Sequence, residues 1–281
     1  MDNNVDELVV NDFGSEWTKF DYALVSKEEL RKNFEQYFDI FPWHELDDSA
    51  VGFDMGCGTG RWAQFVADRV GSLNCIEPSD AIVVAKSKLA SFENVRFFKE
   101  TTETCSLPVK SQDFGYSLGV LHHIPNVSSA LNDCAKLLKD GAPFLIYVYY
   151  NFENRPAWFK ALWSVSDLLR QYISKLPAKS KQLVCNTLGY LIYWPLTRLA
   201  RVADFLKIPG SRHIPLFHYR DKPFYQCLND SLDRFGTRLE KRFSKGEIRL
   251  MLIEAGFVDI TFSESEPYWC CVAYKSSSES C

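Results

Sequence analysis

The sequence predicts an α/β fold in which a doubly wound, mostly parallel sheet is interrupted by a helical, aromatic-rich insertion after its fifth strand. Short apolar runs alternate with segments of helical periodicity from residue 51 to residue 150. Three glycines at alternate positions follow the first apolar run, and the alternation stops near residue 151 and resumes near residue 237. Strands that alternate with helices form parallel βαβ units, with helices on both faces of the sheet.

The elements follow in order along the chain. Ser26 and Glu29 form a capping box for one amphipathic helix in the aromatic-rich stretch 13–43. Five strands are then expected at 51–55, 73–76, 95–98, 114–120 and 144–149. Helices are expected between them at 62–70, 81–89 and 131–138. The insertion predicts two helices, near 157–176 and 181–206. Ser244 and Glu247 form another capping box for a helix that Gly256 ends, and closing strands are expected at 257–262 and 268–274.

This pattern divides the chain into an organised core and its additions. A helical cap segment at 1–45 precedes the core at 46–150, and the insertion at 151–236 is interpreted as a substrate cap. Residues 237–275 complete the core sheet and 276–281 form a tail. The charge-dense run 233–240 is interpreted as a salt-bridged joint that returns the chain to the sheet.

Composition narrows the function classes. The 281 residues are 46% hydrophobic and 24% charged, with a net charge of −4 and no long run of one sign, which argues against a nucleic-acid partner. The start of the chain lacks the pattern of a secretory signal, and no apolar run is long enough for a transmembrane segment. Nine scattered cysteines without a Cys-x-x-Cys pair indicate reduced thiols, a cytoplasmic location and no metal site.

The glycine-rich turn that follows Asp54 is the strongest sign of a ligand. Glycine lets the backbone turn sharply and approach a ligand at the carboxyl end of a strand, where open α/β sheets bind their ligands. A dinucleotide remains an alternative, because Gly58 and Gly60 followed by Ala63 keep a loose form of its motif. S-adenosylmethionine (SAM) carries two cationic groups and no phosphate, so a carboxylate at Asp54 favours it. Glu77, at the end of the second strand, suits ribose hydroxyls in either ligand.

Four segments together resemble successive motifs of the class I SAM-dependent methyltransferases. They are residues 54–60, 77–79, 107–108 and 119–125, the last reading Gly-Val-Leu-His-His-Ile-Pro. With the closing segment 243–262, the resemblance covers about two-thirds of the chain. It implies a Rossmann-like, seven-stranded sheet whose last strand is antiparallel.

The resemblance also implies roles for individual residues in binding SAM, with S-adenosylhomocysteine (SAH) as the product. The methionine part of SAM would lie along Asp54, Gly56, Cys57, Gly58 and Gly60. Glu77 would hold the ribose, and the adenine would lie near Pro78, Ser79, Thr102 and Glu103. Leu118 and Gly119 would lie beside the sulfonium and its methyl group.

Candidate catalytic residues are His122 and His123, just beyond the fourth strand. We expect one of them, preferably His123, to deprotonate or orient the acceptor; the alternative is that the pair only shapes the loop. Acceptor contacts are expected from Trp17 and Tyr22 near the start of the chain, and from His218, Tyr219 and Arg220 in the insertion. The latter run suits an anionic acceptor; the alternative is a solvated charged loop.

These observations predict a methyltransferase acting on an O or N atom of a small-molecule acceptor. An NAD(P)-dependent oxidoreductase and a non-catalytic SAM-binding protein remain as alternatives. A further alternative is that the apolar insertion contacts a membrane or a lipid acceptor. The acceptor and the oligomeric state are not readable from these motifs.

Overall fold

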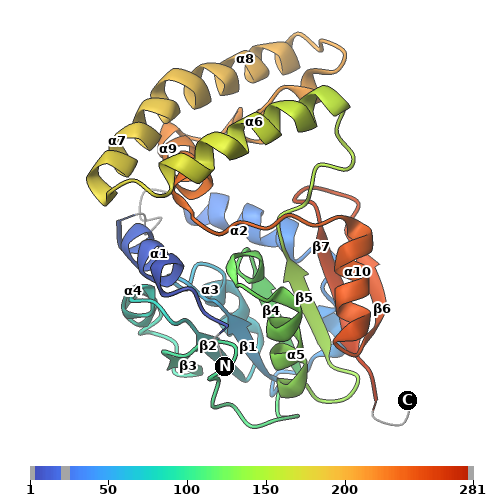
Figure 1. Ribbon diagram of the computed structural model, residues 1–281. Coiled ribbons are helices and arrows are strands. Elements are labelled where there is room, and N and C mark those ends of the chain that lie inside the picture. Colours follow the sequence, from blue (N-terminus) through green and yellow to red (C-terminus); the bar gives the residue numbers. More distant parts are fainter. Residues whose placement is uncertain (1–3, 20–25, 278–281) are drawn as a thin grey trace. The chain divides into compact units, whose positions relative to one another are not determined.

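A seven-stranded sheet forms the centre of the first of two compact units, which comprises residues 1–151 and 241–281 (Figure 1). The computed structural model describes residues 4–19 and 26–277, with only the backbone for residues 15–19. The strands have the order β3-β2-β1-β4-β5-β7-β6. Their bounds are β1 Val51–Met55, β2 Ser72–Ile76, β3 Val95–Phe98, β4 Phe114–Leu118, β5 Pro143–Tyr147, β6 Phe257–Phe262 and β7 Cys270–Lys275. The first five strands are parallel, and β7 is antiparallel to both of its neighbours, as expected.

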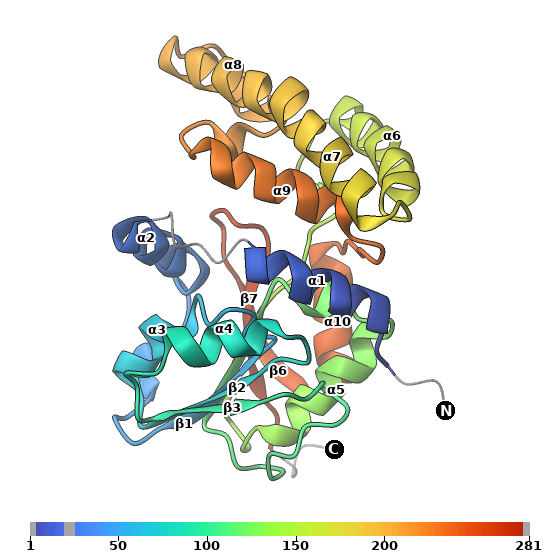
Figure 2. The same cartoon turned by 90° about the vertical axis from the view of Figure 1, so that its left-hand side faces the viewer.

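Helices flank both faces of this sheet, because right-handed crossovers on either side of β1 place them on opposite faces. The first group is α3 (Ala63–Val66) and α4 (Ala81–Lys88), with α2 (Lys27–Tyr37) packed beside α3 through Phe34 and Phe65. The second group is α5 (Val127–Leu137) and α10 (Lys245–Glu254), which lie together in Figure 2. Both capping boxes begin helices as predicted: Ser26 caps α2, and Ser244 with Glu247 caps α10.

The strand register brings the ends of the central strands to one edge of the sheet. Asp54 of β1 pairs with Cys75 of β2 and with Tyr116 of β4. Leu118, the last residue of β4, pairs with Tyr147, the last residue of β5. The loops that leave these strands therefore start side by side, which is where a ligand is expected in such a sheet.

Helix α1 (Glu7–Lys19) was not predicted. Only one helix was expected between residues 13 and 43, and α2 corresponds to it. Gly14 lies inside the continuous helix α1, and a glycine there costs about 1 kcal/mol relative to alanine. Packing explains why the helix forms: a Cβ at Gly14 would lie 3.2 Å from the Cβ of Ser79, so glycine permits close contact with the chain leading into α4.

Strand ends also differ from the expectation by one to two residues. Strand β4 ends at Leu118 because Gly119 has φ +79°, a left-handed conformation that ends an extended strand. The helix expected at 62–70 is shorter in the structure, because α3 ends at Val66 and the chain continues as a 3₁₀ turn at Ala67–Arg69.

The second compact unit, residues 152–240, contains four helices among its residues, all of which the structure describes (Figure 1). They are α6 (Ala157–Ile173), α7 (Ala178–Leu188), α8 (Trp194–Phe205) and α9 (Phe224–Gly236), with a π-helical turn at Gly189–Tyr193 joining α7 to α8. Two helices were expected here. Helix α9 was missed because its sequence contains several weak helix formers, and its packing against α6 and α7 stabilises it. In the described parts of the chain, no helix combines the length and the hydrophobicity needed to cross a membrane.

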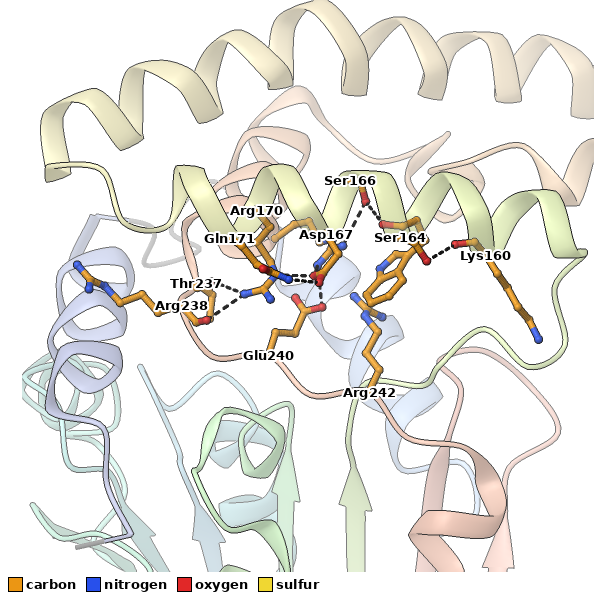
Figure 3. Close-up of polar contacts among 12 residues, drawn as sticks. Lys160, Ser164, Ser166, Asp167, Arg170, Gln171, Thr237, Arg238, Glu240 and Arg242 are labelled. Carbon is orange, nitrogen blue, oxygen red and sulfur yellow. Dashed lines mark hydrogen bonds and ion pairs between the residues drawn. The ribbon is translucent and has the colours of Figure 1, made fainter. Parts of the chain in front are cut away.

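A hydrogen bond from α6 and an ion pair from α9 connect these helices to the return segment of the chain (Figure 3). Arg170 is buried and donates to the Thr237 carbonyl at 2.9 Å. Arg234 forms an ion pair with Glu240 at 2.8 Å, and both side chains are shielded from solvent. The salt-bridged joint predicted at 233–240 is therefore confirmed.

Candidate active site

The glycine-rich turn after β1 is locked onto the end of β2. The amides of Gly56 and Cys57 both donate to the Ile76 carbonyl, at 2.8 and 3.0 Å. Gly56 and Gly60 have φ of +81° and +72°, and a Cβ at either position would lie within 3 Å of a neighbouring side chain. These two glycines are therefore needed for packing. Gly58 differs: it also has a positive φ, +53°, but a Cβ there would have no atom within 4 Å.

Gly119, at the end of β4, has the same property as Gly58. Its φ is +79°, and a Cβ on it would likewise meet no atom within 4 Å. The two bare backbone positions, one after β1 and one after β4, leave room for a ligand to approach the main chain closely. Leu118, which precedes Gly119, is buried.

Asp54 is a buried carboxylate that lacks a full set of partners. Its side chain is 2% exposed, and its Oδ2 atom accepts no hydrogen bond from the described residues. Burial raises the pKa of the Asp54 carboxyl to about 8, and the nearby Tyr116 hydroxyl opposes that rise. A buried acceptor without a partner is costly, so the site suits a ligand that brings a cation or a donor. The ammonium group of SAM fits this requirement.

Glu77 organises the turn that follows β2. Its Oε2 accepts from the Gly58 amide at 3.0 Å, and its Oε1 accepts from the Ser79 amide at 2.9 Å. Each carboxylate oxygen keeps a further lone pair that could accept from a ribose hydroxyl. Pro78 is half-buried between Glu77 and the buried Ser79.

Helix α1 covers this side of the site. Phe13 contacts the His123 ring, with a centroid separation of 4.7 Å, and Gly14 approaches Ser79 as described above. Asn4, just before α1, donates its amide to the Glu103 carboxylate at 2.9 Å, so Glu103 holds the start of the chain. Glu103 is exposed, whereas Thr102 is buried. In the sequence, only the aromatic residues among the first forty positions indicated that this segment would cover the site.

The two histidines lie in a 3₁₀ turn, Leu121–His123, after β4. His122 is fully buried, and neither ring nitrogen has a hydrogen-bond partner among the described residues. Burial lowers the pKa of the His122 imidazole well below its usual range, and His123 and Arg242 add to this effect, so His122 is neutral. His123 is slightly exposed, and the centroids of the two rings are 4.0 Å apart.

Tyrosines at the end of β5 complete the surroundings of the histidines. The Tyr149 ring lies 3.9 Å from the His122 ring and 5.8 Å from the His123 ring, measured between centroids. Tyr147 contacts Tyr37 of α2 at 5.1 Å. No motif in the sequence indicates a binding role for these tyrosines; their position at the carboxyl end of an expected strand is the available signal.

Five residues were expected to contact the acceptor, two near the start of the chain and three in the second unit. Tyr22 lies outside the described residues, as does the side chain of Trp17. His218, Tyr219 and Arg220 belong to the second unit. There the Tyr219 hydroxyl bonds to Asp230, the His218 ring packs edge-on against Tyr219, and Arg220 pairs with Asp204 at 2.8 Å. The Arg220 guanidinium is thus already engaged by a carboxylate.

No group of three or more His, Cys, Asp or Glu side chains within residues 4–19 and 26–277 is arranged to hold a metal ion. The candidate site therefore consists of four features. They are the buried carboxyl of Asp54, the open backbone at Gly58 and Gly119, the carboxylate of Glu77 after β2, and His123 with its aromatic neighbours.

Comparison with known proteins identifies the same region. Residues 53–146 match the family described as "Methyltransferase domain". The chain is 28% identical over 205 residues to a demethylmenaquinone methyltransferase of Staphylococcus aureus, covering 64% of this chain and 83% of that protein. It is 32% identical over 131 residues to a ubiquinone biosynthesis O-methyltransferase of Nitrosomonas europaea, covering 41% of this chain and 54% of that protein.

A solved structure with the same fold is the 1,6-didemethyltoxoflavin-N1-methyltransferase of Burkholderia thailandensis, with bound 1,6-didemethyltoxoflavin and SAH. It is 14% identical, covers 96% of this chain and 88% of its own, and superposes with a TM-score of 0.55.

Proposed function

Because this chain is a class I SAM-dependent methyltransferase, we propose that it transfers the methyl group to an oxygen or nitrogen atom of a small-molecule acceptor, and that a hydroxyl on an aromatic ring is the preferred acceptor. The observation that carries this proposal is the contact of His123, four residues after the open backbone position Gly119, with the Tyr149 ring, at 5.8 Å between centroids. The relatives named for demethylmenaquinone and ubiquinone biosynthesis support an acceptor of the quinone type. With the cofactor assigned to SAM, the oxidoreductase alternative is set aside.

Three parts of the chain would hold the cofactor. Ionised Asp54 would pair with the ammonium of SAM, Glu77 would accept from the ribose hydroxyls, and the main chain at Gly58 would lie against the ligand. When bound, SAM supplies an electrophilic methyl group on a sulfonium that leaves as a neutral thioether. The chain must then align the acceptor and exclude water, and orientation alone can lower the barrier by about 7–11 kcal/mol.

His123 is the proposed base for a hydroxyl acceptor. An imidazole nitrogen of His123 would take the hydroxyl proton while the acceptor oxygen accepts the methyl group that bound SAM would supply. His122 is neutral, fully buried and stacked on Tyr149, so we assign it a supporting role behind His123. Such proton transfer typically contributes about 10²–10⁴-fold to the rate.

The test is methyl transfer from labelled SAM to matched phenol, catechol, hydroquinone and aromatic amine acceptors. We expect methylation of a hydroxylated ring and, in His123→Asn, a rate lower by roughly 10²-fold or more with unchanged SAH affinity. His44→Asn, an exposed histidine in another part of the unit, is the matched control. Transfer only to amines, or an unchanged rate in His123→Asn, would contradict the proposed base.

A further inference from the structure

Helix α6 presents a continuous stripe of apolar side chains to solvent. More than half of each side chain is exposed for Trp158, Leu162, Val165, Leu168, Leu169 and Tyr172. At 100° per residue, these six positions fall within an arc of about 120° on one side of the helix. The other side carries the buried Arg170, so the exposed stripe is not the face that packs within the unit.

The segment formed by α7, the π-helical turn and α8 presents a second stripe. Its exposed residues include Leu183, Tyr190, Leu191, Leu199, Val202 and Phe205, and Phe205 is 84% exposed.

The opposite face of this segment packs within the unit. Ser231 of α9 donates to the Cys185 carbonyl at 2.8 Å, and Tyr193 contacts Phe235. In Figure 1 both helical segments lie around α9. Large exposed apolar patches are rare on soluble monomeric proteins. Two such stripes on one unit of 89 residues therefore indicate a binding surface.

The charge of the same segment is opposite to that of the chain. Residues 157–212 contain nine Lys or Arg and two Asp, a net charge of +7, whereas the whole chain carries −4. Both acids are already engaged, Asp167 by Arg170 at 2.7 Å and Asp204 by Arg220 at 2.8 Å. Six basic residues of this segment are exposed, Lys160, Lys175, Lys179, Arg201, Lys207 and Arg212, and the more exposed of the two acids, Asp204, is paired with Arg220.

We propose that α6 and the α7–α8 segment form a docking surface for an anionic phospholipid bilayer. Helices that combine an apolar face containing aromatic residues with Lys and Arg lie in the membrane interface, held by apolar burial and by attraction to anionic headgroups. A second copy of the chain fits less well, because a two-fold interface would place two surfaces of net charge +7 against each other. The inference does not depend on which acceptor is methylated.

The experiment is co-sedimentation of the full-length chain with vesicles of phosphatidylglycerol and phosphatidylcholine, compared with phosphatidylcholine alone. We expect binding to the anionic vesicles that is at least tenfold stronger, and that weakens as salt shortens the screening length from about 10 Å at 0.1 M to about 3 Å at 1 M. The variants are Phe205→Ser with Leu206→Ser, which removes apolar area, and Lys160→Glu with Lys207→Glu, which reverses charge. Each pair should lower binding at least tenfold.

The matched control is Leu250→Ser with Ile253→Ser, which removes two exposed apolar side chains from α10 in the first unit. It should bind vesicles as the unchanged chain does. Every variant is also titrated with SAH. Binding of SAH shows that the variant is folded, and it does not depend on whether the proposed reaction occurs. Absence of binding, equal binding to neutral vesicles, or a dimer that Phe205→Ser with Leu206→Ser dissociates would overturn the proposal.

Discussion

Replacing Asp54 with asparagine should stabilise the ligand-free protein while weakening SAM and SAH. The folded pKa of Asp54, about 8, lies above its ordinary value of 3.8. The folded state therefore binds more protons than the unfolded state between these values, and stability falls as pH rises through that window. At 1.36 kcal/mol per pKa unit, burial of Asp54 lowers stability by about 4 kcal/mol at pH 7, because the unfolded state is ionised there while the folded carboxyl stays mostly protonated. Asp54→Asn removes this cost and its pH dependence.

The effect on the ligand has the opposite sign. A cationic ammonium pairs with the ionised carboxylate, so the apparent affinity should rise between pH 6 and pH 8. Removing one partner of a buried charge pair costs about 2–5 kcal/mol, so Asp54→Asn should bind SAH roughly 30-fold more weakly or worse at pH 8.

Thermal unfolding of the ligand-free protein from pH 5 to pH 9, with calorimetric titration of SAM, SAH and NADH, measures both effects. Asp68→Asn, an exposed acid in the 3₁₀ turn after α3, is the matched control and should change neither. The reasoning is refuted if Asp54→Asn is less stable than the unchanged chain at pH 8, or if it binds SAH as tightly.

Three further changes test the neighbouring features. Glu77→Gln keeps the shape but removes the charge that the Gly58 amide contacts at 3.0 Å; calorimetry should show SAH affinity lower by about 5–30-fold. Gly58→Ala should weaken SAH at least tenfold, whereas Gly141→Ala, with φ +81° and equally open surroundings in the loop before β5, should strain the backbone without affecting SAH. Glu240→Gln removes one of the two carboxylates paired with Arg234 and leaves Asp167 at 3.5 Å, so unfolding of the second unit should become easier by about 1.5–3 kcal/mol in a thermal melt, with unchanged SAH binding.

Local patterns accounted for most of the sheet and for its cofactor edge. Strands β1 and β3 begin and end where the apolar runs predicted, because each run lies between turn residues of the chain itself. The same locality placed Asp54 and Glu77 at neighbouring strand ends, since parallel strands in sequence order share an edge. Helix α1 was missed because Gly14 lowers its intrinsic propensity, and only contact with the chain before α4 compensates.

The proposed acceptor residues show where local patterns end. The run His218, Tyr219 and Arg220 stays a predicted anion-binding segment, and what the fold adds is the contact of Tyr219 with Asp230 and of Arg220 with Asp204. Asp230 lies eleven residues from Tyr219 along the chain, and Asp204 lies sixteen residues from Arg220. The periodicity of the sequence does not predict contacts at these separations. The contact of Tyr149 with the two histidines likewise depends on the register between β4 and β5.

The sequence by itself determined the fold class, the glycine turn and the two acids at its edge, because periodicity, glycine content and strand order act over short stretches of chain. Only the tertiary structure decided that Asp54 keeps an unpartnered oxygen, that Phe13 covers His123, and that the apolar residues of α6 face solvent instead of a core. Burial and partner choice depend on which distant segments pack together, and that packing is a property of the folded chain as a whole.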